Sequence, residues 1–297
     1  MNYAIFRSEP IYTLNGLAQI GSHNKREKKA YNSNPDIKLE LTKNNIELIT
    51  LDSKYVKGFH ELTKEYRLEH DERMKIERED RKISVVLSFA NQMGMVAATS
   101  LTTKMINNFA PRYMVMTGIA GGTKPDKMNF GDVIIAETSW DYRAGKDIRK
   151  NDNTQHLNSI NALSIDTKLI SYCRNLGQDK AKLREIKDSF KMGDAPGTEL
   201  QLLIGPVVSG ASVITDPEIV KDILENQHRE VLAIEMEIYG MYYAAKWAIN
   251  PRPKFIALKA ISDFADSNKG DKYHKYASYT SAKVFEILAK EYFEYEE

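Results

Sequence analysis

One stretch of the chain decides the fold class: ISVVLSFANQMGMVAATSLTTKMINNFAPRYMVMTGIAGG, residues 83–122. Its two ends are short apolar runs rich in β-branched residues, which is the pattern of buried strands. The run between them, residues 94–109, has the length and spacing of a helix. A strand, a helix and a second strand in this order indicate an α/β fold.

The same alternation continues to the end of the chain. Further short apolar runs are GDVIIAE (131–137), GPVVSGASVI (205–214), VLAIEME (231–237) and FIALKAISDFAD (255–266). The closing run YASYTSAKVFEILAKEYF (276–293) has a helical apolar stripe that docks on the sheet or on a partner. We therefore predict a three-layer α/β fold with a central mixed sheet flanked by helices.

The first 82 residues differ in character. GSHNKREKK (21–29) is basic, and residues 55–82 carry mixed charges with a thin apolar stripe, which predicts a helix. We place a domain boundary at residue 82, which separates a charged, largely helical segment (1–82) from an α/β domain (83–297).

Composition limits the broad class of protein. The chain has 297 residues and a formal net charge of +1, so charge alone gives no reason to expect nucleic acid or a membrane. A single cysteine, Cys173, allows no internal disulfide and suits a reducing cytoplasm. No apolar run approaches the roughly 20 residues that span a bilayer, and no signal peptide is evident. We expect a soluble, cytoplasmic protein.

Two strand ends carry carboxylates. Glu235 and Glu237 lie in AIEMEIYGMYYAAKWAI (233–249), and Glu237 falls where a predicted strand becomes a helix. Asp263 follows the predicted strand FIALKAI. Ligands of open α/β sheets bind at this end of the strands, and a carboxylate there can accept hydrogen bonds from a ribose diol. A salt-bridged glutamate and a helix-capping aspartate are the structural alternatives.

A glycine-rich corner precedes these sites in the sequence. Gly121 and Gly122 follow the strand YMVM closely, and glycines let backbone amides approach a ligand. The pattern is neither a P-loop nor GxGxxG. A tight turn at the strand end is the alternative, and Gly131 with Asp132 looks like a structural turn into the next strand.

Five of these pieces together resemble a known family. QMGMVAAT, TGIAGG with GDVIIAE, GPVVSGASVI, AIEME and AISDFAD occur in the order found in the nucleoside phosphorylase and nucleosidase superfamily. That group contains the methylthioadenosine/S-adenosylhomocysteine nucleosidases. WDYRAGK and KYASYTSA are similar to a bacterial branch linked to adenine-nucleotide cleavage in phage defence.

The resemblance implies roles for individual residues. Asp263 would be the general acid at purine N7, and Glu237 would hold the ribose hydroxyls. The other substrate-binding residues implied are Met236 at the sugar, Val213 and Ile214 at the base, Ser262 beside Asp263, and Gly121 and Gly122 near the attacking water or phosphate. The reaction of this family requires no metal and no cofactor, and neighbouring subunits often complete the pocket, so we expect a homo-oligomer.

The sequence departs from the family pattern in three places. Ile119 stands where phosphorylases use a hydroxyl to hold phosphate, which favours hydrolysis over phosphorolysis. Val213 stands where the nucleosidases often stack a phenylalanine on the base. The N-terminal strands of the family, which supply a water-activating acid, look absent, and neither Asp52 nor Glu61 is assigned that role.

The front segment resembles a different family. NYAIFRSEP, SHNKREKKAYNSNPDI and TKNNIELI are similar to the start of plasmid mobilisation/recombination (Mob/Pre) relaxases, whose first motif matches His23 and Asn24. The second histidine motif of that family is absent from the sequence, so we expect no relaxase chemistry. Residues 23–29 could still give weak DNA contact through phosphates. The remaining histidines read as surface or core residues: His60, His70, His156, His228 and His274.

The sequence thus predicts an enzyme that cleaves the N-glycosidic bond of a purine nucleoside or nucleotide. Arg143 and Lys146, followed by Lys150, are candidates to hold substrate phosphates, and solvated loop charge is the alternative. Two other hypotheses are a nucleoside-binding module without catalysis and a DNA-binding protein of the plasmid mobilisation type.

Overall fold

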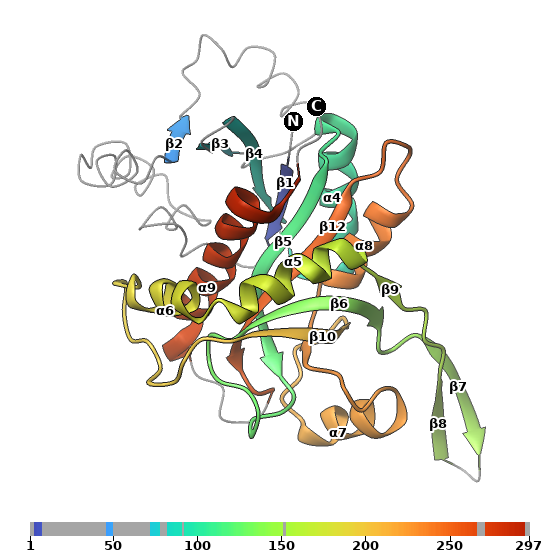
Figure 1. Ribbon diagram of the computed structural model, residues 1–297. Helices are drawn as coiled ribbons and strands as arrows, with labels where there is room; N and C mark the ends of the chain where they lie inside the picture. The colour runs from blue at the N-terminus through green and yellow to red at the C-terminus, as the bar shows by residue number, and fades with distance from the viewer. Residues whose placement is uncertain are drawn as a thin grey trace, which may run out of the picture.

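The computed structural model describes residues 3–7, 46–49, 72–77, 82–90, 92–150, 153–265 and 271–294. Figure 1 shows a central twisted sheet with helices on both faces. The strands of the main sheet are β1 (Tyr3–Arg7), β2 (Ile46–Ile49), β3 (Glu72–Glu77), β4 (Lys82–Phe89), β5 (Tyr113–Gly122), β6 (Val133–Asp141), β9 (Leu163–Ser164), β10 (Leu202–Ser209), β11 (Ala233–Glu235) and β12 (Lys254–Asp263). Parallel and antiparallel pairings both occur, so the predicted mixed sheet is confirmed.

Five strands close on themselves around the later part of the sheet. The strand order runs β11-β10-β6-β12-β5, and β11 also pairs with the end of β5. The pairings of these five strands therefore form a ring. Their ends meet at Gly121, which pairs with Asp263 of β12 on one side and with Ile234 of β11 on the other.

Helices cover the two faces as separate layers. One layer contains α4 (Met95–Phe109) and α8 (Ile238–Lys246), which pack against each other. The other contains α5 (Thr167–Gln178), α6 (Lys180–Asp188) and α9 (His274–Ile287), and α9 continues into the π-helical turn η2 (Leu288–Tyr292). Because α9 packs on β5 and β12, its apolar stripe docks on the sheet. Helix α7 (Pro217–Asn226) packs beside β10, with Ile223 buried.

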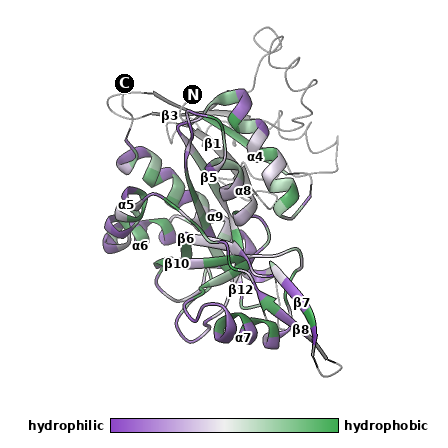
Figure 2. Cartoon of the chain, turned by 90° about the vertical axis from the view of Figure 1, so that its right-hand side faces the viewer, coloured by the Kyte–Doolittle hydropathy of each residue, from purple (hydrophilic) through white to green (hydrophobic). Residues whose placement is uncertain are grey.

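A hairpin extends away from this body. Strands β7 (Gly145–Lys150) and β8 (Asn153–Asn158) pair with each other in a separate two-stranded sheet. Figures 1 and 2 both show the hairpin projecting beyond the layers, and in Figure 2 it mixes hydrophilic and hydrophobic segments. No described helix is long and apolar enough to cross a bilayer.

The turn into β6 is structural, as its sequence suggests. Gly131 has a φ of 84°, and a Cβ there would lie 2.1 Å from the ring of Tyr276. Asp132 accepts hydrogen bonds from Asn129 N at 2.8 Å and Gln201 N at 2.9 Å. Burial raises the pKa of Asp132 to about 6, although these hydrogen bonds oppose the shift. Both residues therefore serve the packing of β6 and α9.

The structure corrects three predictions about individual elements. Residues 72–77 form strand β3 and not part of a helix over 55–82, because Met74 and Ile76 alternate with period two and pair with β4. The rest of that predicted helix lies outside the described residues. The N-terminal strands are present, since β1 lies between β4 and β5 and runs parallel to both. Strand β5 runs through Gly122, so the glycine corner is strand and not a turn.

The remaining N-terminal predictions are only partly covered. Asp52, Glu61 and residues 23–29 lie outside the described residues. The domain boundary at residue 82 stays a prediction. Strands from both sides of it, β1 and β5 among them, lie in one sheet.

Candidate active site

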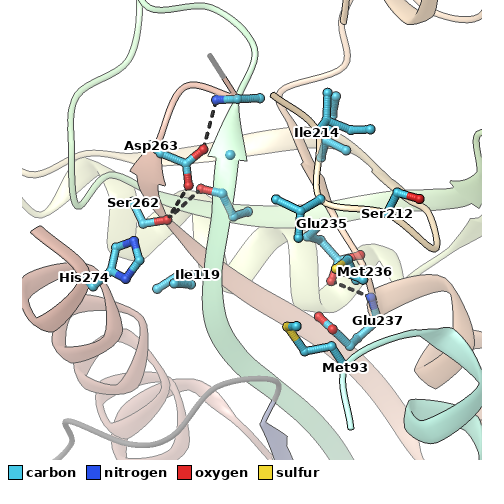
Figure 3. A pocket seen from close by; sticks show the side chains of 15 residues that line it. Met93, Ile119, Ser212, Ile214, Glu235, Met236, Glu237, Ser262, Asp263 and His274 are labelled. Carbon is cyan, nitrogen blue, oxygen red and sulfur yellow. Dashed lines mark hydrogen bonds between the residues drawn. The ribbon is translucent and has the colours of Figure 1, made fainter. Parts of the chain in front are cut away.

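A pocket of about 260 Å³ opens where β5, β11 and β12 end. Figure 3 shows carboxylates and apolar side chains facing one another across it. The acidic lining residues are Glu235, Glu237 and Asp263. The apolar lining residues include Met93, Ile119, Val213, Ile214 and Met236. Mostly apolar walls with a few converging polar groups are typical of small-molecule sites.

Asp263 owes its position to an irregularity in β12. The register between β12 and β5 shifts between Ile261 and Asp263, so Ser262 is an extra residue at the strand end. Such a bulge redirects the side chain that follows it. Asp263 is half-buried, and its Oδ1 accepts a hydrogen bond from Ala265 N at 2.9 Å. The Ser262 hydroxyl donates to Asp263 Oδ2 at 3.0 Å, which fixes the carboxyl plane (Figure 3).

Gly121 lies between β11 and β12, whose ends lead to Glu237 and Asp263, and the close packing there leaves no room for a side chain. A Cβ on Gly121 would lie 3.1 Å from Asp263 Oδ1 and 3.2 Å from the Cβ of Ala265. A side chain would therefore push on the carboxyl group itself. Gly122 is absent from the described lining of the pocket, and a Cβ there would meet Ile261 and Phe264 at 3.0–3.1 Å. The structure thus brings Gly121 to the site and gives Gly122 a packing role.

Glu237 stands at the switch from β11 to α8, where the sequence placed it. It occupies the N-terminal boundary of α8 and is 4% exposed. Its Oε1 accepts a hydrogen bond from Gly94 N at 3.1 Å, and its Oε2 lies 3.1 Å from Lys259 Nζ. An ammonium group and a backbone N–H both stabilise the ionised form of a carboxylate.

Glu235 also lines the pocket, but its carboxylate oxygens are bound by neighbouring protein groups. Its oxygens accept hydrogen bonds from the Ser209 hydroxyl at 2.5 Å, from Glu237 N at 2.9 Å and from Ile238 N at 3.0 Å. Burial raises the pKa of Glu235, the charge of Lys259 counteracts this, and Glu237 adds to it. Glu235 therefore fixes the first turn of α8, from which Glu237 reaches the pocket.

The other predicted substrate-binding residues divide into two groups. Val213 and Ile214 lie on the loop after β10 and line the pocket, with Val213 56% exposed at its mouth and Ile214 buried. Met236 and Ser262 also line it. Arg143 and Lys146 do not lie among the described lining residues, since Arg143 is an exposed residue before β7 and Lys146 is in the projecting hairpin.

Four pocket features were not predicted from the sequence. His274, which the sequence indicates only as a surface or core histidine, lines the pocket from the first turn of α9. Met93 lines it from the segment before α4. Gly94 and Lys259 hold Glu237 from behind. Lys259 had a visible signal, because a lone lysine inside the apolar strand FIALKAI must find buried partners.

Comparison with known proteins places the chain in a family. The sequence model of the Phosphorylase superfamily matches residues 48–294, and the chain belongs to that family. An Escherichia coli protein called ATP nucleosidase Cap17 is 28% identical over 218 residues, which are 70% of this chain and 42% of that one. A 5′-methylthioadenosine/S-adenosylhomocysteine nucleosidase of Buchnera aphidicola is 25% identical over 222 residues, 71% of this chain and 80% of that one.

Solved structures agree on the fold. The Neisseria meningitidis 5′-methylthioadenosine/S-adenosylhomocysteine nucleosidase in complex with methylthio-immucillin-A superposes with a TM-score of 0.58 at 19% identity. The superposition covers 97% of this chain and 98% of that one. The chain spans less than half the length of several curated relatives, among them the E. coli ATP nucleosidase and an uncharacterised Sinorhizobium fredii protein. The predicted phosphorylase-like fold is therefore confirmed.

Proposed function

We propose that this chain hydrolyses the N-glycosidic bond of an adenine nucleoside or nucleotide and releases free adenine. The observation that carries the proposal is the placement of Glu237 and Asp263 in one pocket, at the ends of the two strands that flank Gly121: Glu237 follows β11 and Asp263 ends β12. One carboxylate then faces the sugar while the other faces the leaving base. The names of the two nucleosidase relatives support the substrate class.

The chemistry divides between the two carboxyl groups. Asp263, in its protonated form, donates a proton to purine N7 as the C1′–N9 bond breaks, so the electron pair leaves with a neutral base. The sugar develops positive charge in the transition state, as in other glycoside hydrolyses. The ionised Glu237 accepts hydrogen bonds from the ribose hydroxyls and stabilises that charge. Water then adds its oxygen to C1′ and gives up one proton to solvent, which balances the proton that Asp263 transferred to the base.

Hydrolysis is favoured over phosphorolysis by the pocket wall. Ile119 lines the pocket at the position where the family's phosphorylases place a phosphate-holding hydroxyl, and an isoleucine side chain donates no hydrogen bond. The apolar side chains of Met93 and Met236 face the same space (Figure 3). We infer that water is the acceptor of the ribosyl group.

The experiment is a base-release assay on the purified chain. Adenosine, methylthioadenosine, AMP and ATP are each incubated with and without phosphate, and free adenine is measured by chromatography. Adenine release in phosphate-free buffer is the expected result. Release that requires phosphate would instead assign phosphorolysis, and adenine release from none of them by a folded protein would favour a binding module.

We also propose that the chain forms a homo-oligomer through the α4–α8 layer. Val96 of α4 is 87% exposed, and Trp247 at the end of α8 is 63% exposed. Tyr243 lies beside Trp247, with ring centroids 6.4 Å apart, and is 47% exposed. Large exposed apolar side chains on one layer are typical of subunit contacts. Sedimentation analysis of the wild type and of Trp247→Glu should show an oligomer that the substitution dissociates.

A further inference from the structure

Lys259 carries a charge in the most apolar part of the molecule. It lies in the middle of β12, its neighbours Leu258 and Ala260 are fully buried, and the lysine itself is 0% exposed. An ammonium group so placed is strongly unfavourable unless carboxylates surround it. Its Nζ lies 3.1 Å from Glu235 Oε2 and 3.1 Å from Glu237 Oε2. Among the described residues, these three groups form a buried charge cluster with one positive and two negative members.

The two carboxylates of this cluster have different surroundings. Glu235 is anchored by Ser209 and by backbone N–H groups at the start of α8. Glu237 has a backbone N–H on one oxygen, Lys259 on the other, and the pocket in front. Lys259 thus connects a fixed carboxylate to one that faces the substrate.

Electrostatics explains why a single lysine matters here. Burial lowers the pKa of Lys259, but the charges of Glu237 and Glu235 outweigh this, so its pKa is raised and it stays protonated. Burial raises the pKa of Glu235, and the Lys259 charge is the main force against that rise. Tyr242 of α8 also faces Glu235, and its pKa is raised by burial first and by Glu235 in addition. Without Lys259, the two glutamates would face each other in a buried space.

We propose that Lys259 is a positioning residue that keeps the buried Glu235–Glu237 pair charged and holds Glu237 aimed at the ribose hydroxyls of the substrate. This inference rests on the proposed function. The role belongs to binding and transition-state stabilisation at the sugar and leaves the proton transfer from Asp263 to the base unchanged.

The pH dependence follows from the signs of these charges. With Lys259 removed, the pKa of Glu235 rises further, and the buried pair of carboxylates takes up one proton as the pH falls. A shared proton removes the negative charge that the sugar requires. Activity is therefore lost on the acidic side and recovers as the pH rises and the pair becomes fully ionised.

The first experiment compares adenosine cleavage by the wild type and Lys259→Met between about pH 6 and pH 9. We expect kcat/KM of the variant to fall by about a hundredfold at the acidic end, with the acidic limb of the profile moved to higher pH. Lys259→Arg keeps the charge and should restore the position of that limb. Lys283→Met removes a lysine that pairs with Glu286 on α9, and it serves as the matched control with an unchanged profile.

The second experiment is a double-mutant cycle with Glu237→Gln. If Lys259 acts through Glu237, then adding Lys259→Met to Glu237→Gln lowers kcat/KM little beyond the single change. The inference would be overturned if the losses in kcat/KM of the two single variants multiplied in the double variant. It would also be overturned if Lys259→Met lost the same factor in kcat/KM at every pH. Thermal unfolding checks each variant. Lys259→Gln replaces the methionine variant if that one is unfolded, and failure of both to fold would also overturn it, because the lysine would then be purely structural.

A binding experiment tests the role of Lys259 even if the proposed hydrolysis is wrong. If the wild type releases no base from any substrate, the proposed function fails, and calorimetry with adenosine and 2′-deoxyadenosine tests Lys259 alone. We expect the wild type to bind adenosine more tightly than 2′-deoxyadenosine, and Lys259→Met to lose that preference at acidic pH. Equal preference in both proteins, or no binding by either, would contradict it.

Discussion

The two acidic strand ends of the pocket are built in opposite ways. At the end of β11, Glu237 is 4% exposed and contacts a buried lysine and a backbone N–H. At the end of β12, Asp263 is half-buried and contacts a serine hydroxyl and the Ala265 N–H. The first carboxylate is buried between two donors, one of them charged, whereas the second is half-buried and its donors among the described residues are uncharged. The difference suits one group that must stay ionised and one that must transfer a proton.

The largest expected effect is at the β12 side. Asp263→Asn keeps the shape and removes the transferable proton, so adenine release should fall by about 10²–10⁴-fold, while the affinity for adenosine changes little. Steady-state kinetics and calorimetry measure the two quantities. Asp126→Asn, on the exposed turn between β5 and β6, is the control and should behave as wild type. Activity that survives Asp263→Asn would mean that Asp263 is not the general acid.

On the β11 side, substitution of Glu237 should change the preference between nucleosides as well as the rate. Glu237→Gln removes the charge facing the sugar, and kcat/KM for adenosine should fall by about 10²–10³-fold. The wild type should prefer adenosine to 2′-deoxyadenosine, and the variant should lose most of that preference because an uncharged amide oxygen is a weaker acceptor for the hydroxyls than a carboxylate. Parallel kinetics on the two nucleosides give the ratio. An unchanged ratio would mean that Glu237 does not hold the ribose.

Gly121 pairs with both β11 and β12, and its substitution should lower kcat/KM moderately. Gly121→Ala places a methyl group about 3.1 Å from Asp263 Oδ1, so the carboxyl group must move. We expect about a tenfold loss in kcat/KM, since small misplacements of a catalytic group slow the reaction. Gly197→Ala is the matched control, because a Cβ at Gly197 meets nothing within 4 Å. Equal activity of the two variants would show that the spacing at Gly121 is not critical.

The smallest effect is expected outside both sides, near the hairpin. A combined Arg143→Glu and Lys146→Glu substitution should change adenosine cleavage by no more than about twofold, as is usual for surface positions. The same protein assayed with ATP tests the prediction that these side chains hold substrate phosphates. A selective loss with ATP would bring the hairpin into the substrate site, and equal rates with both substrates would exclude that role.

The sequence predicted the layers well because the signals are local. Short β-branched runs, the helix over 94–109 and the strand-end carboxylates are read from spacing alone, and α4, β5, β12 and the position of Glu237 agree with it. The family assignment, made for residues 83–297, is confirmed, and the family model begins earlier, at residue 48, within the segment that was assigned to the relaxases. The assigned roles of Asp263 and Glu237 stay predictions until the variants are measured.

The features that the sequence misread or did not reveal depend on contacts between distant segments. Residues 72–77 are rich in charge and were read as helical, and only pairing with β4 makes them a strand. The pocket position of His274 depends on how α9 docks against β12, which no local pattern shows. The contact between Lys259 and Glu237 could be predicted only by knowing that β12 and the start of α8 lie side by side. Long-range pairing decided each of these cases.

The most direct test of the account is an experimental structure of the Asp263→Asn variant with adenosine bound. We predict that purine N7 lies within hydrogen-bond distance of the side chain at position 263, and that the ribose hydroxyls bind the Glu237 carboxylate, with Lys259 behind it. A nucleoside bound in the reverse orientation, or outside the pocket between β11 and β12, would contradict the division of labour between the two strand ends.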